Sequence, residues 1–166
     1  FGNALRTPDA LERTETLVRL TRQLTPETLP GAIRAYHDDL YPLETVDLRI
    51  LMAYWAKHEP RRMLEEVGEW SDSRVQRLAA AQAIAEVAKN EGYDSARAIY
   101  DEMPTYMSSA GLPNLVIGMI EHGRLEDLAG FITSFQSPDE HEMVTSIALH
   151  QMIRAHGPAV VQTWIE

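Results

Sequence analysis

Histidines and carboxylates occur at two places in the chain where they could bind a metal ion or activate a water molecule. His37, Asp38 and Asp39 are consecutive, and an imidazole beside two carboxylates can orient a water or ligate a metal. His141 begins a stretch like the His-Glu-x-x-His zinc motif, but Thr145 occupies the position of the second ligand. We therefore expect no metal at His141, and keep 37–39 as the candidate residues of an enzyme.

Other chemical signatures are missing from the sequence. It contains no phosphate-binding Gly-x-x-x-x-Gly-Lys-Ser/Thr, no Gly-x-Gly-x-x-Gly and no Gly-x-Ser-x-Gly nucleophile motif. His58, His122 and His156 recur just before helix-breaking residues, where an imidazole favourably meets the last carbonyls of a helix. The sequence predicts no catalytic, cofactor-binding or metal-ligating residue and no cofactor. It favours a non-catalytic role and leaves enzymatic activity open.

Composition narrows the classes further. The chain has 166 residues, 15 Lys and Arg against 25 Asp and Glu, a net charge of −10 and no cysteine. The absence of cysteine excludes a disulfide scaffold, a thiolate zinc site and a cysteine nucleophile. The negative charge argues against a nucleic-acid-binding surface, which needs clustered Lys and Arg.

The length and the apolar pattern predict one soluble domain. No run of 18 or more apolar residues occurs, so we expect no membrane span, and the sequence does not indicate a compartment. The chain starts at Phe1 instead of a methionine, and its end, 160–166, lies inside an amphipathic pattern. We interpret 1–166 as a single domain excised from a longer protein.

Helix signals dominate the chain, and strand signals are nearly absent. Thr7-Pro8, Thr25-Pro26 and Ser137-Pro138 each place a hydroxyl cap before a proline at the first helical position. Apolar residues recur at spacings of three and four between these starts and the glycines that end helices. We predict ten helices, over residues 8–24, 26–40, 44–58, 60–69, 72–90, 93–103, 112–122, 124–136, 138–156 and 158–166.

A weak internal repeat connects these helices. Residues 56–60 align with residues 88–92, which lie 32 positions later, and Gly123 and Gly157 follow Gly92 at intervals of 31 and 34. A short helix with one aromatic residue follows each breaker; these aromatics are Trp70, Tyr100, Phe131 and Trp164. Two helices per unit of about 31–34 residues are typical of helical solenoids.

Two stretches resemble known repeat families. Gly92 precedes a helix rich in alanine and aromatic residues, over 93–103, which is similar to the second helix of tetratricopeptide and pentatricopeptide repeats. Trp55-Ala56 followed by Glu59-Pro60 resembles a Trp-Ala-x-x-acid-Pro pattern of uncharacterised bacterial helical-repeat proteins. The resemblance implies a superhelix that binds a partner, commonly a protein, and it assigns no functional residue.

We therefore predict an all-α fold, a right-handed α-solenoid of about five antiparallel helical hairpins, with a compact helical bundle as the alternative. The predicted function is a non-catalytic protein-interaction module. A helical enzyme domain built around 37–39 is the second hypothesis. A third is RNA binding, as in pentatricopeptide repeats, which the scarcity of basic residues disfavours.

Charge indicates where a partner would bind. Residues 1–83 carry 11 basic and 13 acidic side chains, whereas residues 84–166 carry 4 and 12. An acidic face attracts a basic protein or peptide. A predicted loop, 106–113, adds an aromatic and a methionine, residues that suit adaptable recognition. The predicted partner-binding residues are Asp101, Glu102, Tyr106, Met107, Glu126 and Asp127.

Overall fold

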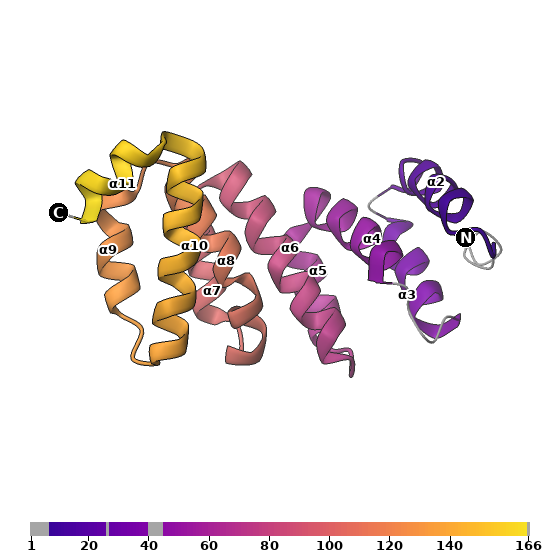
Figure 1. Ribbon diagram of the computed structural model, residues 1–166. Helices are drawn as coiled ribbons and strands as arrows, with labels where there is room; N and C mark the ends of the chain where they lie inside the picture. The colour runs from indigo at the N-terminus through magenta and orange to yellow at the C-terminus, as the bar shows by residue number, and fades with distance from the viewer. Residues whose placement is uncertain (1–6, 26, 40–44, 166) are drawn as a thin grey trace. The chain divides into compact units, whose positions relative to one another are not determined.

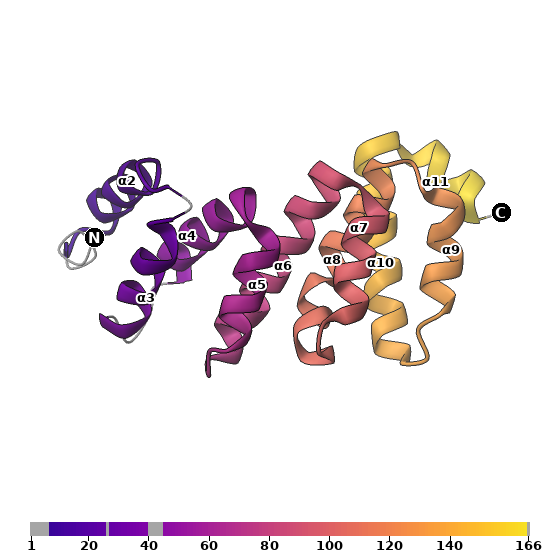
Figure 2. The same cartoon turned by 180° about the vertical axis from the view of Figure 1, so that it is seen from behind.

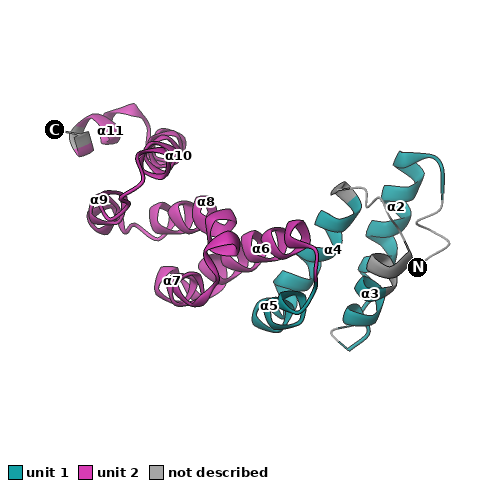
Figure 3. Ribbon diagram, turned by 90° about the horizontal axis from the view of Figure 1, so that it is seen from below, with its two compact units in different colours: residues 1–70 teal, residues 71–166 magenta. Residues whose placement is uncertain are grey.

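The computed structural model describes residues 7–25, 27–39 and 45–165, apart from the side chains of 35–39, 45, 46, 163 and 165. The chain forms two compact units, Phe1–Trp70 and Ser71–Glu166 (Figure 3). Every regular element of the described part is a helix (Figure 1; Figure 2 from behind). The predicted all-α class is confirmed over these residues, which hold ten helices and no strand.

The predicted helices agree well with the observed ones. Nine of the ten start within three residues of the predicted position. In the first unit the helices are α2 (Ala10–Thr21), α3 (Leu29–Asp39), α4 (Thr45–His58) and α5 (Pro60–Gly68). In the second they are α6 (Ser73–Glu91), α7 (Tyr93–Glu102), α8 (Thr105–Glu121), α9 (Leu125–Thr133), α10 (Pro138–His156) and α11 (Pro158–Ile165).

The predicted helix starts are right at one proline and displaced at another. Ser137 caps α10, because its Oγ accepts from the backbone N–H of Glu140 at 3.5 Å, and Pro138 follows as predicted. The cap of α2 is Asp9 and not Thr7, since the Asp9 carboxylate accepts from the N–H of Glu12 at 2.8 Å. An ionised carboxylate is the stronger acceptor for these exposed N–H groups.

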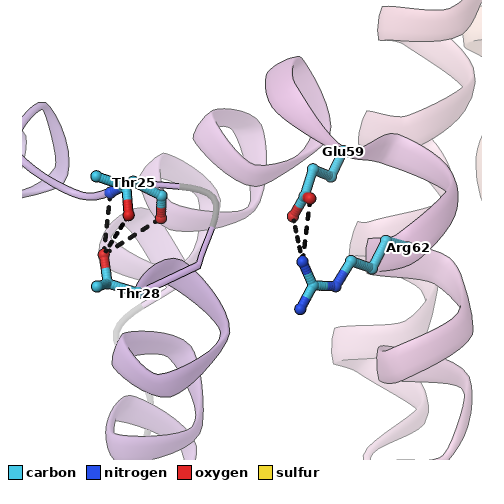
Figure 4. A network of polar contacts seen from close by, with 4 residues as sticks. All are labelled: Thr25, Thr28, Glu59 and Arg62. Atoms are coloured by element: carbon cyan, nitrogen blue, oxygen red, sulfur yellow. Dashed lines mark hydrogen bonds and ion pairs between the residues drawn. The ribbon is translucent and has the colours of Figure 1, made fainter.

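The start of α3 also moves, from the predicted residue 26 to Leu29. Thr25 and Thr28 form a closed turn before it, in which Oγ1 of Thr28 accepts from the N–H of Thr25 at 2.9 Å and lies 3.2 Å from its carbonyl (Figure 4). In the same view Arg62 donates to both carboxylate oxygens of Glu59, at 3.0 and 3.2 Å, across the start of α5. Short polar turns therefore set both junctions.

Glycine ends three helices as predicted. Gly92, Gly123 and Gly157 have φ of 92°, 70° and 82°, in the left-handed region that residues with a Cβ rarely adopt. At Gly92 and Gly157 the backbone N–H bonds a carbonyl four residues earlier, which closes the last turn of α6 and α10. The punctuation deduced from the sequence is therefore correct at these three turns.

The predicted loop at 106–113 is wrong, because α8 begins at Thr105 and continues through this segment to Glu121. The carbonyl of Pro104 accepts from the N–H groups of Met107 and Ser108, at 2.8 and 3.0 Å, and starts the helix. Pro113 lies inside α8 and removes one backbone donor. Gly111 also lies inside α8, where a Cβ would meet the side chain of Ile84.

In the first unit, α2 and α4 run side by side in the same direction. Near their starts, Nε of Arg13 donates to Oδ2 of Asp47 at 3.0 Å, with both side chains buried. Near their ends, the hydroxyl of Tyr54 donates to the carbonyl of Leu24 at 3.1 Å. Trp55 is fully buried in this core. The side chains of α3 and α5 meet through Nε of Arg34 and Oε1 of Glu66.

In the second unit the helices form two rows. Figure 3 shows α6, α8 and α10 in one row and α7, α9 and α11 in the other. In this unit each helix packs against the next one along the chain, and α8 also packs against α6 and α10. Fully buried aliphatic residues fill the space between the rows, among them Ile84, Leu112, Leu115, Met119 and Leu128.

Small residues bring α6 and α8 very close together. A Cβ built on Gly118 lies 2.7 Å from Cβ of Ala88, and one built on Gly111 lies 2.1 Å from Cδ1 of Ile84. Between these glycines, the amide of Asn114 donates to the carbonyl of Ala81 at 2.8 Å. The two helices run in the same direction, and at Gly118 the missing side chain allows their backbones to approach, because Cβ of Ala88 cannot move aside.

Candidate partner-binding surface

The six predicted partner-binding residues come from α7, the first turn of α8 and the first turn of α9. Asp101, Glu102, Glu126 and Asp127 are exposed, and Tyr106 keeps 45% of its surface open to solvent. Met107 does not: it is only 4% exposed, because it faces inward from the first turn of α8. The loop that would have presented Met107 is helix, so this residue packs in the core.

Arg124 links the starts of α7 and α9. Its Nε donates to Oδ2 of Asp127 at 2.6 Å and its Nη1 to Oδ2 of Asp94 at 3.3 Å. The guanidinium also lies over the ring of Tyr93, 5.4 Å from the centroid. The hydrogen bond to Asp127, followed by the charge of Asp94, raises the pKa of Arg124. One arginine thus neutralises part of the acidic charge at this end of the unit.

Arg97 likewise neutralises part of the acidic charge, farther along α7. Its Nε lies 2.8 Å from both carboxylate oxygens of Asp101, one turn later on the same helix. The hydrogen bond to Asp101 raises the pKa of Arg97, which also stacks on Phe131 of α9 at 5.0 Å and on Tyr100 at 5.9 Å. The charge of Asp101 is therefore partly used inside the protein.

The structure does not gather the four predicted acids into one site. Asp94 and Arg124 join the starts of α7 and α9, so the two helices run in the same direction. Asp101 lies seven residues beyond Asp94, or about 10 Å along the helix axis. Asp101 and Glu102 therefore lie where the helices of this row end, and Glu126 and Asp127 lie where the helices begin.

A second helix row adds negative charge at the end where α7 stops. Burial raises the pKa of Tyr100, a hydrogen bond with Ser108 opposes this, and the nearby charge of Glu140 raises it further. The first turn of α10, which carries Glu140, lies on the same side of the unit as the end of α7 (Figure 1; Figure 2 from behind). We call Asp101, Glu102, Tyr106 and Glu140 the acidic edge; Glu140 was not among the predicted binding residues.

The histidines divide between those the structure describes and those outside it. The side chains of His37, Asp38 and Asp39 lie outside the described residues. Nε2 of His122 lies 2.5 Å from the carbonyl of Ala88, so the ring meets the end of α6, not the end of its own helix α8. His58 packs against Tyr54 with ring centroids 4.6 Å apart. In the described part, no three His, Asp or Glu side chains are grouped to hold a metal.

A groove of about 310 Å³ lies between α8 and α10, near the ends of both helices. Its lining mixes apolar and charged side chains, from Ile117, Ile120, Glu121, Gln151, Arg154 and Ala155. Because it opens between two helices of the same row, it is a place where an extended or helical segment of a partner could lie. The groove could not be predicted from the sequence, because the residues that α8 contributes lie 30 or more positions from those of α10.

The chain matches no known protein family, no curated protein and no solved structure. No described helix is long and apolar enough to cross a membrane.

Proposed function

We propose that the chain is a right-handed helical-repeat solenoid that acts as a non-catalytic protein-interaction module. The observation that carries the proposal is the spacing of the long-range polar contacts. They join residues that lie about one sequence repeat apart, in both units. The pairs, with their separations, are Arg13–Asp47 (34), Leu24–Tyr54 (30), Arg34–Glu66 (32), Ala81–Asn114 (33), Ala88–His122 (34) and Asp94–Arg124 (30).

This spacing is what stacked helical hairpins require. When hairpins stack, each helix packs against the equivalent helix of the next hairpin, and contacts recur at the length of one repeat. The sequence period of about 31–34 residues was deduced independently, from the positions of alanines and glycines. A seventh contact, from Nε1 of Trp164 to the carbonyl of Leu125, spans 39 residues and includes the longer turn before α10.

The acidic edge supports a basic protein segment as the partner. Glu102 is exposed and has no ion-pair partner among the described residues, and Tyr106, four residues later, offers an exposed aromatic ring. Of the four basic residues in 84–166, Arg97 and Arg124 are paired with carboxylates. The remaining positive charge is small, so this half of the chain attracts cations and repels nucleic acid.

The test is isothermal titration of the chain with two pools of 12-residue peptides, one rich in Lys and Arg and one rich in Asp and Glu. We expect binding of the basic pool only, weakening at least fivefold between 50 and 300 mM salt. Asp101→Asn, Glu102→Gln and Glu140→Gln, combined in one chain, should weaken it at least fivefold.

The control variant removes the same charge elsewhere, by Glu15→Gln, Glu65→Gln and Glu69→Gln on exposed sites of the first unit. Its affinity should stay within twofold of the unchanged protein. Equal binding of both pools would disprove the electrostatic part of the proposal. Equal loss in the two triple variants would show that net charge, and not the acidic edge, attracts the peptide.

A further inference from the structure

We propose that two copies of the chain associate through the exposed face of α10. The two α10 helices are antiparallel and related by a two-fold axis that crosses this face at the height of residue 148. This surface is separate from the acidic edge, and the inference does not depend on the proposed function. It starts from a helix face that exposes large apolar side chains.

The exposed stripe of α10 consists of Met143, Ser146, His150 and Ile153, at spacings of three, four and three residues. Met143 is 39% exposed and Ile153 is 49% exposed, whereas the other described leucines, isoleucines and methionines of this unit are buried or half-buried. The opposite face of α10, centred on Ala148, is fully buried. The stripe is therefore the outer face of this helix, directed away from the core.

The equivalent face of the preceding helix in the same row is buried. Gly123 and Gly157 end equivalent segments 34 residues apart, so Ser146 and His150 correspond to Leu112 and Val116 of α8. Leu112 and Val116 are both fully buried in the core that α8 shares with α10. In α8 this face packs against α10, whereas the α10 stripe is exposed in the described part of the chain.

Charge selects an antiparallel second copy as that neighbour. The first turns of α10 are acidic, with Asp139 and Glu142 exposed, and its last turn is basic, with Arg154 exposed. Two antiparallel α10 helices place the acidic end of each beside the basic end of the other and also oppose their helix dipoles. Two parallel copies would align like charges.

The apolar residues fit the same symmetry. Met143 and Ile153 are each five residues from Ala148, on opposite sides, and Glu142 and Arg154 are each six residues from it. A two-fold axis at the height of residue 148 therefore sets Met143 of one copy at the height of Ile153 of the other, and Glu142 at the height of Arg154. Along the helix axis, the apolar and the charged residues of the stripe are thus arranged symmetrically.

A contact made by one helix face is smaller than the standard interface of about 800 Å² per partner, so the dimer should be weak, with a Kd on the order of 10–100 µM. Sedimentation equilibrium between 5 and 500 µM measures it. We expect a concentration-dependent dimer, and Ile153→Ser should raise the dissociation constant at least tenfold. Leu11→Ser, at the most exposed apolar residue of α2, is the control and should leave it unchanged.

Charge reversal tests the pairing. Glu142→Arg alone and Arg154→Glu alone should each weaken the dimer, because like charges then meet across the axis. The chain that carries both reversals is complementary again and should dimerise as the unchanged chain does. A double variant no stronger than the single ones would overturn the pairing, and so would a chain that stays monomeric up to 500 µM.

Cross-linking tests the direction of the helices. The chain has no cysteine, so single cysteines can be introduced without interference. A mixture of Met143→Cys and Ile153→Cys chains, treated with a short bismaleimide, should give the mixed dimer as the main product. Cross-linking of Met143→Cys with itself would indicate parallel helices, and loss of dimer in Leu11→Ser would place α2 at the contact; either result refutes the proposal.

Discussion

Replacing Gly118 by alanine adds a methyl group where α8 already touches α6. Its Cβ would lie 2.7 Å from Cβ of Ala88, whereas carbon atoms in favourable contact are about 3.5–4.0 Å apart. Ala88 has no side-chain torsion that could move this atom, so the helices must separate. Overpacking of this kind costs about 1–3 kcal/mol, and alanine regains about 1 kcal/mol of helix propensity. We expect a net loss of about 1 kcal/mol.

The reverse change, Ala88→Gly, shows whether this contact is the cause. Alone it loses about 1 kcal/mol of helix propensity. In the Gly118→Ala background it restores the space, and the two propensity changes cancel. The doubly substituted chain should therefore lie within about 0.5 kcal/mol of the unchanged one, although the separate losses add to about 2 kcal/mol.

The assay is urea unfolding followed by far-ultraviolet circular dichroism and by fluorescence of Trp164, with Trp55 and Trp70 replaced by phenylalanine in every chain compared. Gly130→Ala is the matched control, because Gly130 lies inside α9 with no atom within 4 Å of an added Cβ. It should stabilise the second unit by about 1 kcal/mol. If the losses from Gly118→Ala and Ala88→Gly simply add, the two helices do not meet at these residues.

Two further predictions concern charged groups. Asp47→Ala should destabilise the first unit by about 3 kcal/mol, since it breaks the buried pair with Arg13, and Arg13→Met in the same chain should recover most of that loss in urea unfolding. Asp72 caps α6, and its hydrogen bond with Arg74 lowers the pKa of Asp72 below the ordinary 3.8. Its contribution is therefore fully present above pH 3.8 and declines as the pH falls through the lowered pKa. Asp72→Asn should cost about 0.5 kcal/mol at pH 7 and less than that at pH 2, measured by thermal unfolding; an equal cost at both pH values would contradict this.

Local signals explain most of what the sequence predicted correctly. Gly92, Gly123 and Gly157 end segments because a left-handed backbone is needed there, and this requirement belongs to the residue itself. The start of α10 is also a local feature, because Ser137 caps the helix and Pro138 suits its first position. Such features depend on a few neighbouring residues, so the sequence alone reveals them.

The errors come from contacts between distant residues. Gly111 and Pro113 have the composition of a loop, but the segment is helical and packs against α6, where Ile84 lies beside Gly111. His122 bonds the end of α6 for a similar reason, since α6 ends beside it. Met107 is buried because the helix around it forms. Propensity indicates what a segment tolerates, and packing decides which option it takes.

The predicted binding residues illustrate the same limit. Charge counting found the acidic half of the chain, but it could not find that Arg97 and Arg124 already engage Asp101 and Asp127. Nor could it separate the two ends of the α7–α9 row. Glu140 joins the acidic edge because α10 begins near the place where α7 ends, a proximity that sequence spacing does not contain.

Equivalent faces of α8 and α10, two helices of the same row, differ in burial, and the proposed self-association uses this difference. A helix inside such a row must satisfy a neighbour on both sides, so α8 carries Gly111 and Gly118 toward α6, and buries Leu112 and Val116 as well. In α10 the residues equivalent to Leu112 and Val116 are polar, and Met143 and Ile153 remain exposed on either side of them. A face of this mixed kind is suited to a contact that forms and dissociates, because transient interfaces are about as polar as the rest of a protein surface, whereas obligate interfaces are more apolar.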